Sequence, residues 1–194
     1  MREIVPGVQT WAWLSPRFGY DFNGYYLPEH RLAIDPVEIP DEVLDQLAAR
    51  GVERIALTNR NHFRDAAKLS ARTGARVAVH AADRGFVESK GVAVAEALEA
   101  GGRIGPFVIL AAPGKSPGEV ALHWPARRLL LIGDACVGPA PGRLGLLPDA
   151  VIDDKPRLLE SLRELAALDV DTLLLGDGHS ILSGARAALQ ALVG

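Results

Sequence analysis

The stretch Ile55-Ala56-Leu57-Thr58-Asn59-Arg60-Asn61-His62-Phe63-Arg64 runs from an apolar segment into a polar loop. The short apolar run before Thr58 predicts a buried strand over residues 54–57. A helical pattern then extends from about Phe63 to Arg72 and is expected to end at Gly74, because glycine readily closes a helix in the left-handed conformation. The segment therefore predicts a strand, a polar loop and a helix in succession.

The same alternation of strand and helix continues on both sides of this stretch. Strands are predicted at 8–14, 23–27, 31–34, 76–79, 92–95, 107–110, 120–123, 129–132 and 172–175. Helices are predicted at 41–51, where Asp41 is expected to be the N-cap, at 155–168 and at 184–193. Residues 85–131 lack a helical period and indicate an antiparallel sheet, and the Gly-Pro-rich segment 138–142 is expected to be a surface loop. Strands in two blocks, with helices at both ends, predict two sheets covered by helices.

Composition limits the classes of function. A length of 194 residues suits one domain spanning 1–194, and a formal net charge of −3 with interspersed signs provides no basic surface for nucleic acid or an anionic membrane. The only cysteine, Cys136, has no partner for an internal disulfide, and the first residues lack the apolar run of a signal peptide. We therefore expect a cytoplasmic protein with no membrane partner, and the sequence permits either a monomer or an oligomer.

Several short motifs occur in a defined order along the chain. They are Asn23-Gly24-Tyr25-Tyr26-Leu27 with Ala33-Ile34-Asp35-Pro36, then Ile55-Ala56-Leu57-Thr58, Ala112-Pro113-Gly114-Lys115-Ser116-Pro117-Gly118, Leu131-Ile132-Gly133-Asp134 and Leu175-Gly176-Asp177-Gly178-His179. In this order they resemble the metallo-β-lactamase superfamily, and the resemblance covers most of the chain. It implies an α/β fold, the four-layered αββα sandwich, and a cleft that binds metal at the ends of the strands.

The residues at the metal positions depart from the family pattern. The resemblance places five residues at former ligand positions where the side chain is an amide, an aromatic ring or a cation: Asn59, Asn61, Phe63, Arg64 and Lys115. Only Asp134 and His179 match the family ligands. Catalytic zinc generally needs three imidazole, thiolate or carboxylate ligands, and a protonated lysine has no lone pair to donate. No cofactor is therefore expected, and zinc enters only as the alternative, through Asp134 and His179.

Two interpretations of the new cations remain open. In the first, Arg64 or Lys115 pairs with Asp134 and replaces the charge of the metal, because an unpaired buried carboxylate costs several kcal/mol. In the second, both cations form an anion-binding pocket together with the amides of Asn59 and Asn61. His62 occupies a spacer position of the family motif. We therefore expect it to point away from the cleft and to make local hydrogen bonds, with a role as metal ligand or acid/base as the alternative.

The sequence thus favours a metallo-β-lactamase-like protein without zinc-dependent hydrolysis, with a binding or regulatory role or a metal-independent activity. Under the second interpretation of the cations, its former active-site cleft takes a small anionic ligand. One alternative is a divergent hydrolase with a reduced single-metal site at Asp134 and His179, completed by a recruited group such as His62. Another is a structural or partner-binding protein whose cleft is filled by side chains. Glyoxalase-II-like members of the superfamily use an extra C-terminal domain to bind the glutathione group. The sequence ends at Gly194, soon after the last predicted helix, so we expect no such domain and no glutathione thioester as substrate.

Overall fold

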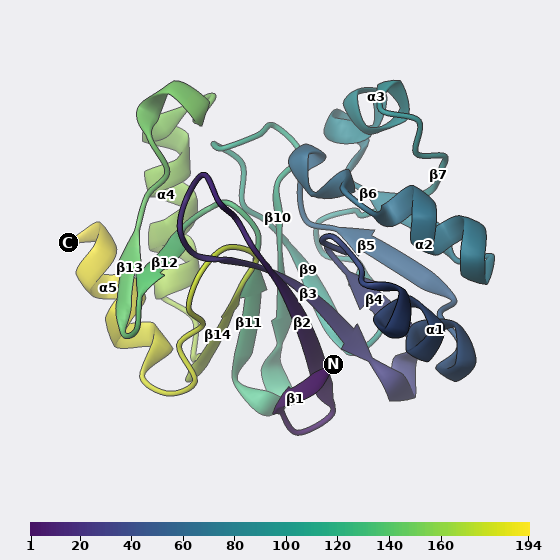
Figure 1. Ribbon diagram of the computed structural model, residues 1–194. Coiled ribbons are helices and arrows are strands. Elements are labelled where there is room, and N and C mark those ends of the chain that lie inside the picture. The colour runs from purple at the N-terminus through teal and green to yellow at the C-terminus, as the bar shows by residue number, and fades with distance from the viewer.

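Two packed β-sheets form the centre of the computed structural model, which describes residues 1–194 (Figure 1). The larger sheet has the strand order β1 (Arg2–Val5), β2 (Val8–Leu14), β3 (Asp21–Leu27), β4 (Leu32–Ile34), β5 (Arg54–Leu57), β6 (Arg76–Val79) and β7 (Val94–Ala97). The second has the order β14 (Thr172–Leu175), β11 (Leu129–Ile132), β10 (Val120–Trp124), β9 (Phe107–Ala111) and β8 (Arg103–Ile104). A separate pair is formed by β12 (Val137–Ala140) and β13 (Arg143–Gly145).

Helices cover the outer faces of both sheets (Figure 1). The larger sheet carries α1 (Asp41–Arg50), α2 (Ala66–Thr73) and α3 (Ala81–Ser89), and the smaller carries α4 (Lys155–Ala166) and α5 (Ala185–Val193). The apolar core has three corresponding layers. One packs Val43, Leu47 and Leu69 against the larger sheet, the second fills the space between the sheets, and the third packs Leu158, Leu162 and Leu189 against the smaller sheet. The fold is the αββα sandwich that the sequence predicts.

Strand direction explains why polar residues gather at one edge of the sandwich. Strands β4, β5, β6 and β7 are parallel neighbours, and β11 is parallel to β14. The carboxyl ends of parallel strands lie at the same edge of a sheet, so the loops after β4, β5, β11 and β14 converge. Those loops begin with Asp35, Thr58, Gly133 and Gly176.

Several local predictions need correction. Pro40 rather than Asp41 is the N-cap of α1, and the carboxylate of Asp41 makes no capping hydrogen bond. The segment 138–142 is not a plain loop, because most of it pairs with residues 143–145 to form the β12–β13 hairpin. Helix α3 (Ala81–Ser89) overlaps the start of residues 85–131, for which the sequence indicated an antiparallel sheet. At its start, the Nδ1 atom of His80 accepts a hydrogen bond from the amide of Ala82 at 3.2 Å.

The helix after the polar loop starts later than predicted. Residues Arg60–Phe63 form the short 3₁₀ helix η2, and α2 begins only at Ala66. The predicted end is correct, since Gly74 closes α2 with a φ of 75°. This 3₁₀ turn decides the direction of the side chains in the polar loop.

Candidate functional site

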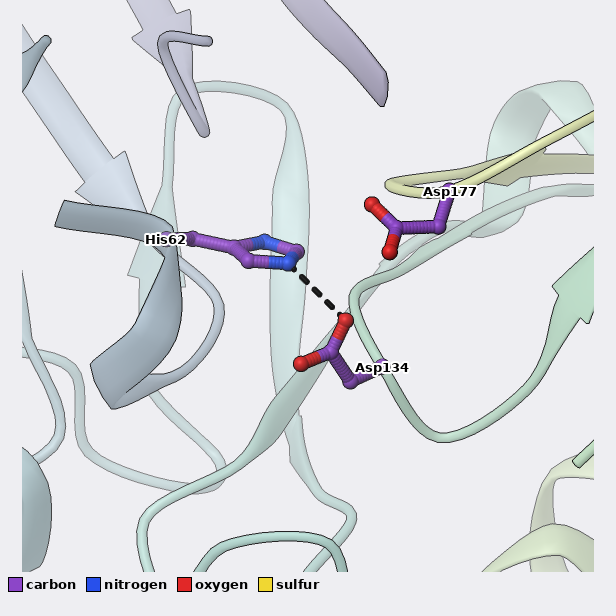
Figure 2. Close-up of side chains that lie close together, drawn as sticks. All are labelled: His62, Asp134 and Asp177. Carbon is purple, nitrogen blue, oxygen red and sulfur yellow. Dashed lines mark hydrogen bonds and ion pairs between the residues drawn. The ribbon is translucent and has the colours of Figure 1, made fainter. Parts of the chain in front are cut away.

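His62 points into the edge where the loops converge, contrary to the expectation that it faces away. Asn59 begins the 3₁₀ turn by accepting a hydrogen bond from the amide of Asn61 at 2.8 Å, and the turn directs the His62 ring inward. Space for the ring comes from Gly176, where a Cβ atom would lie only 2.6 Å from Cε1 of His62. The ring is completely buried. Figure 2 shows it pointing toward Asp134 and Asp177.

Both nitrogens of the His62 ring face carboxylates. Nδ1 lies 2.9 Å from Oδ2 of Asp35 and 3.1 Å from the hydroxyl of Thr58, while Nε2 lies 3.0 Å from Oδ1 of Asp134. Burial alone would lower the pKa of His62, but the charges of Asp35 and Asp134 outweigh it and raise that pKa to about 10. His62 is therefore an imidazolium at neutral pH, held between two aspartates.

The other oxygen of Asp134 is bound by a lysine. Nζ of Lys115 lies 2.6 Å from Oδ2 of Asp134 and also donates a hydrogen bond to the side-chain oxygen of Asn61. Although burial opposes it, the charges and hydrogen bonds of His62 and Lys115 hold the pKa of Asp134 well below its usual range. The predicted contact between Lys115 and Asp134 is therefore present, and the ammonium is nearly inaccessible to solvent because only 5% of the residue is exposed.

Arg64 pairs with a different aspartate from the one expected. Its Nη2 atom lies 3.1 Å from Oδ1 of Asp177, and its guanidinium carbon lies 4.2 Å from the ring centroid of Phe22. Burial and the negative charge of Asp134 raise the pKa of Asp177 to about 6, against the opposing effect of His62 and Arg64. Asp177 rather than His179 thus enters the cluster.

The structure places two of the sequence-predicted site residues outside the cluster. His179 is exposed and borders a different cavity of about 210 Å³, beside Asp21 and Ser180. Phe63 packs against the core layer under the helices of the larger sheet and lies 6.4 Å, between ring centroids, from Phe86. Asn61 is exposed on the surface, and its side-chain oxygen accepts the hydrogen bond from Lys115.

Glu119 is a further buried acid beside the cluster. Only 1% of the residue is exposed, and neither carboxyl oxygen has a hydrogen-bond partner. Burial and the charge of Asp134 raise the pKa of Glu119 well above its usual value, which favours the neutral acid. The Nδ2 atom of Asn59 is likewise buried without a partner, and both groups lie close to Gly133.

Comparison with known proteins identifies the family of the chain. A profile described as the metallo-beta-lactamase superfamily matches residues 2–194. The chain belongs to the metallo-beta-lactamase superfamily. A hydroxyacylglutathione hydrolase from Cereibacter sphaeroides (strain ATCC 17025 / ATH 2.4.3) is 33% identical over an alignment of 161 residues that covers 78% of this chain and 60% of that protein. The chain therefore spans about 60% of the length of this curated relative.

Solved structures of the superfamily share the fold at low sequence identity. A metallo-beta-lactamase from Erythrobacter litoralis has a TM-score of 0.77 at 16% identity and covers 98% of this chain and 94% of that one. A metallo-beta-lactamase from Pseudomonas aeruginosa, solved in a mono-zinc form, has a TM-score of 0.76 at 12% identity, with coverage of 99% and 93%. These likenesses show the αββα fold, and the chemistry has to be argued from the residues of this chain.

The superfamily includes metal-binding proteins, so the donor set requires a test of fit. His62, Asp134 and Asp177 each bring one ligand atom within 4.8 Å of the others, and a group of this kind could hold a metal ion. A ligating imidazole must be neutral, however, whereas His62 is protonated and both its nitrogens already face carboxylates. Lys115 and Arg64 also bind the two aspartates that would be ligands. With these ion pairs formed, the residues fit a bound divalent cation poorly.

Three acids of the cluster were missed by the sequence reasoning, namely Asp35, Glu119 and Asp177. Each stands inside or directly beside a motif already quoted: Asp35 in Ile-Asp-Pro, Glu119 after Pro-Gly, and Asp177 in Gly-Asp-Gly. An acid within a turn between glycines or prolines is the signal that could have identified them. In the Leu175-Gly176-Asp177-Gly178-His179 motif, the family pattern points to the histidine as the ligand, so Asp177 was passed over.

Proposed function

We propose that the protein is a metal-independent binding protein whose former catalytic centre is closed by internal ion pairs, and that it takes a small anionic ligand beside Arg64. The observation that supports the first half is the occupancy of Asp134, whose two oxygens contact Nε2 of His62 at 3.0 Å and Nζ of Lys115 at 2.6 Å. A carboxylate with both oxygens paired to protein cations has little remaining capacity for a metal.

Charge balance supports the same conclusion. Three cationic side chains, His62, Lys115 and Arg64, face three aspartates, Asp35, Asp134 and Asp177. A further divalent cation would add positive charge to a cluster that is already neutral, and in a buried site such an excess is costly. The cations of this chain thus fulfil the electrostatic role of a metal.

The anion site must use Arg64 rather than Lys115. Lys115 is buried and its Nζ atom already contacts Asp134 and Asn61, so the anion pocket expected between both cations does not suit this geometry. Arg64 is one-fifth exposed, and it lines a cavity of about 630 Å³. Its Nη2 atom contacts Asp177, whereas Nη1 is buried and has no acceptor within the protein. A carboxylate or phosphate could satisfy that donor after a small movement of the side chain.

Elemental analysis tests the proposal directly. Protein purified without chelators should carry only traces of zinc, iron and manganese after dialysis, and its melting temperature should not rise when these metals are added. The positive control is the same procedure applied to the metallo-beta-lactamase from Pseudomonas aeruginosa that was solved in a mono-zinc form. Stoichiometric metal that survives dialysis would refute the proposal.

A second candidate function follows from the grouping of His62, Asp134 and Asp177 within 4.8 Å. It is a divergent hydrolase with one metal at these residues, in which Asp177 takes the place that the sequence gave to His179. This function requires His62 to lose its proton and Lys115 to leave Asp134. Because the curated relatives are named hydroxyacylglutathione hydrolases, hydrolysis of a hydroxyacylglutathione after metal loading is the activity to assay. Activity that depends on added metal and disappears in an Asp134→Asn variant would favour this candidate.

A further inference from the structure

The cavity beside Arg64 has walls of mixed character. Two aromatic and four charged residues line it: Trp13, Phe22, Glu38, Arg64, Asp65 and Lys68. Its volume of about 630 Å³ lies within the range of cavities that bind small molecules. The aromatic side is continuous, since the ring centroids of Trp13 and Phe22 are 5.7 Å apart.

Two of the four charged residues are already occupied by the protein backbone. Oδ2 of Asp65 accepts a hydrogen bond from the amide of Ile39 at 2.7 Å, and Nζ of Lys68 donates one to the carbonyl oxygen of Ile39 at 2.7 Å. Lys68 also lies 3.5 Å from a carboxyl oxygen of Asp41. These contacts hold the loop that carries Glu38 against α2, and they leave little capacity for a ligand.

The other two charges have fewer contacts with the protein. Glu38 is exposed and makes no hydrogen bond or ion pair. One-fifth of the Arg64 side chain is exposed at the cavity, and its Nη1 atom has no acceptor but is itself buried, so a ligand reaches that donor only after the side chain moves. The backbone beside Glu38 is nevertheless held in place, because the amide of Ile39 is bound by Asp65 and its carbonyl oxygen by Lys68. The cavity thus presents one anion without a partner, Glu38, and one partly exposed cation, Arg64, that is paired on one side with Asp177, together with an aromatic surface.

We propose that the ligand of this cavity is a small zwitterion with an apolar body, of the amino-acid or short-peptide class. Its carboxylate pairs with Arg64, its ammonium with Glu38, and its apolar body covers the ring of Trp13. The inference rests on the proposed function, because it specifies the anionic ligand placed there. A purely anionic ligand would leave Glu38 unpaired, whereas a zwitterion pairs with Glu38 as well as with Arg64.

The experiment compares probes that share a phenyl body and differ in charge. Calorimetric titrations use L-phenylalanine, hydrocinnamate, which lacks the amino group, and phenethylamine, which lacks the carboxylate. A second pair, glycyl-phenylalanine and its N-acetyl form, tests a longer distance between the charges. In at least one pair, the zwitterion should bind about two- to five-fold more tightly than the anion, which is the range expected for a solvent-exposed ion pair. Phenethylamine should bind most weakly.

Variants assign the difference to particular residues. Glu38→Gln should remove the advantage of the zwitterion while leaving hydrocinnamate unchanged, and the matched control Glu42→Gln should retain the advantage, because Glu42 is exposed on α1 and does not line the cavity. Trp13→Leu should weaken every probe by about two- to ten-fold through the lost aromatic contact. Arg64→Gln risks unfolding, because it leaves Asp177 without its partner. The test therefore uses Glu38→Gln and Trp13→Leu.

Three outcomes would overturn the inference. They are equal binding of zwitterion and anion in both pairs, an advantage that persists in Glu38→Gln, and no binding of any probe at concentrations up to about 10 mM. The first would leave the proposed anion site intact, since hydrocinnamate would still bind. Stoichiometric metal in the purified protein would instead refute the proposed function whatever the probes do.

Discussion

The charge of His62 should make the stability of the protein depend on alkaline pH. The pKa of its ring is 6.5 in the unfolded chain and about 10 in the folded protein. A group whose pKa is raised on folding stabilises the folded state fully below its unfolded pKa and loses that contribution as the pH rises through its folded pKa. We therefore expect the free energy of unfolding to decrease between about pH 7 and pH 10.

The size of the effect follows from the same two values. One pKa unit corresponds to about 1.4 kcal/mol, so the decrease should approach 1.4 kcal/mol per pH unit and reach on the order of 5 kcal/mol in total. A domain is commonly stable by only about 5–15 kcal/mol. Losing the proton of His62 should therefore bring the protein close to unfolding at pH 10.

Urea unfolding at several pH values measures this dependence, and ring ¹⁵N shifts of His62 report its protonation directly. The His62→Gln variant should lose the pH dependence in this window, and at pH 7 it should be less stable by about 3–5 kcal/mol because a buried ion pair loses one partner. His179→Gln is the matched control, since His179 is exposed and lies outside the cluster. Equal slopes for His62→Gln and the parent protein, or a ring that titrates below pH 7, would refute the ion-pair argument.

Three other predictions concern the same cluster. The first uses a triple variant in which histidine replaces Asn59, Asn61 and Lys115. It should gain zinc affinity and a melting temperature that rises with added zinc, whereas a single Asn59→His variant should gain little. If the melting temperature of the triple variant does not change with zinc, the three positions do not converge on one site. The second concerns Asp177, whose pKa is raised from 3.8 to about 6 on folding. Its protonated form stabilises the folded state below about pH 4, and this contribution is lost as the pH rises through 6. Urea unfolding of Asp177→Asn between pH 4 and 7 should lack this slope. The third is that Gly176→Ala should displace the ring of His62 and lower the free energy of unfolding by about 1–3 kcal/mol, which thermal melts can show. The control is Gly85→Ala on α3, where a Cβ atom meets nothing within 4 Å, and it should be neutral or stabilising.

The αββα fold was predictable because its evidence is local and ordered along the chain. Strands such as Thr172–Leu175 and Val8–Leu14 are short runs of apolar and β-branched residues bounded by turns, and the structure has them at the predicted residues. Helix α3 was missed for a physical reason. It contains Gly85, and its start is secured by Asp83, whose carboxylate accepts hydrogen bonds from the amides of Arg60 and Gly118 and from the hydroxyl of Ser116. These partners are distant in sequence and leave no periodic pattern.

The site was predictable only in part because side-chain direction depends on distant residues. The contact of Lys115 with Asp134 followed from motif order and the need to pair a buried carboxylate. The inward direction of His62 depends on the space at Gly176, which is more than a hundred residues away in the chain. Motif register likewise pointed to His179, whereas the turn brings Asp177 to the cluster. No local pattern carries that information.

The ion pairs of the cluster join the two sheets, and this has a kinetic consequence. His62 and Asp134 are 72 residues apart in sequence, and Arg64 and Asp177 are 113 apart, with one partner of each pair following the larger sheet and the other following the smaller. Contacts between such distant segments carry a high entropic cost of loop closure, so we expect them to form after the rate-limiting step of folding. Breaking them should then accelerate unfolding and leave the folding rate almost unchanged. The cluster would thus form late in folding and set the unfolding rate, which determines the lifetime of the folded state.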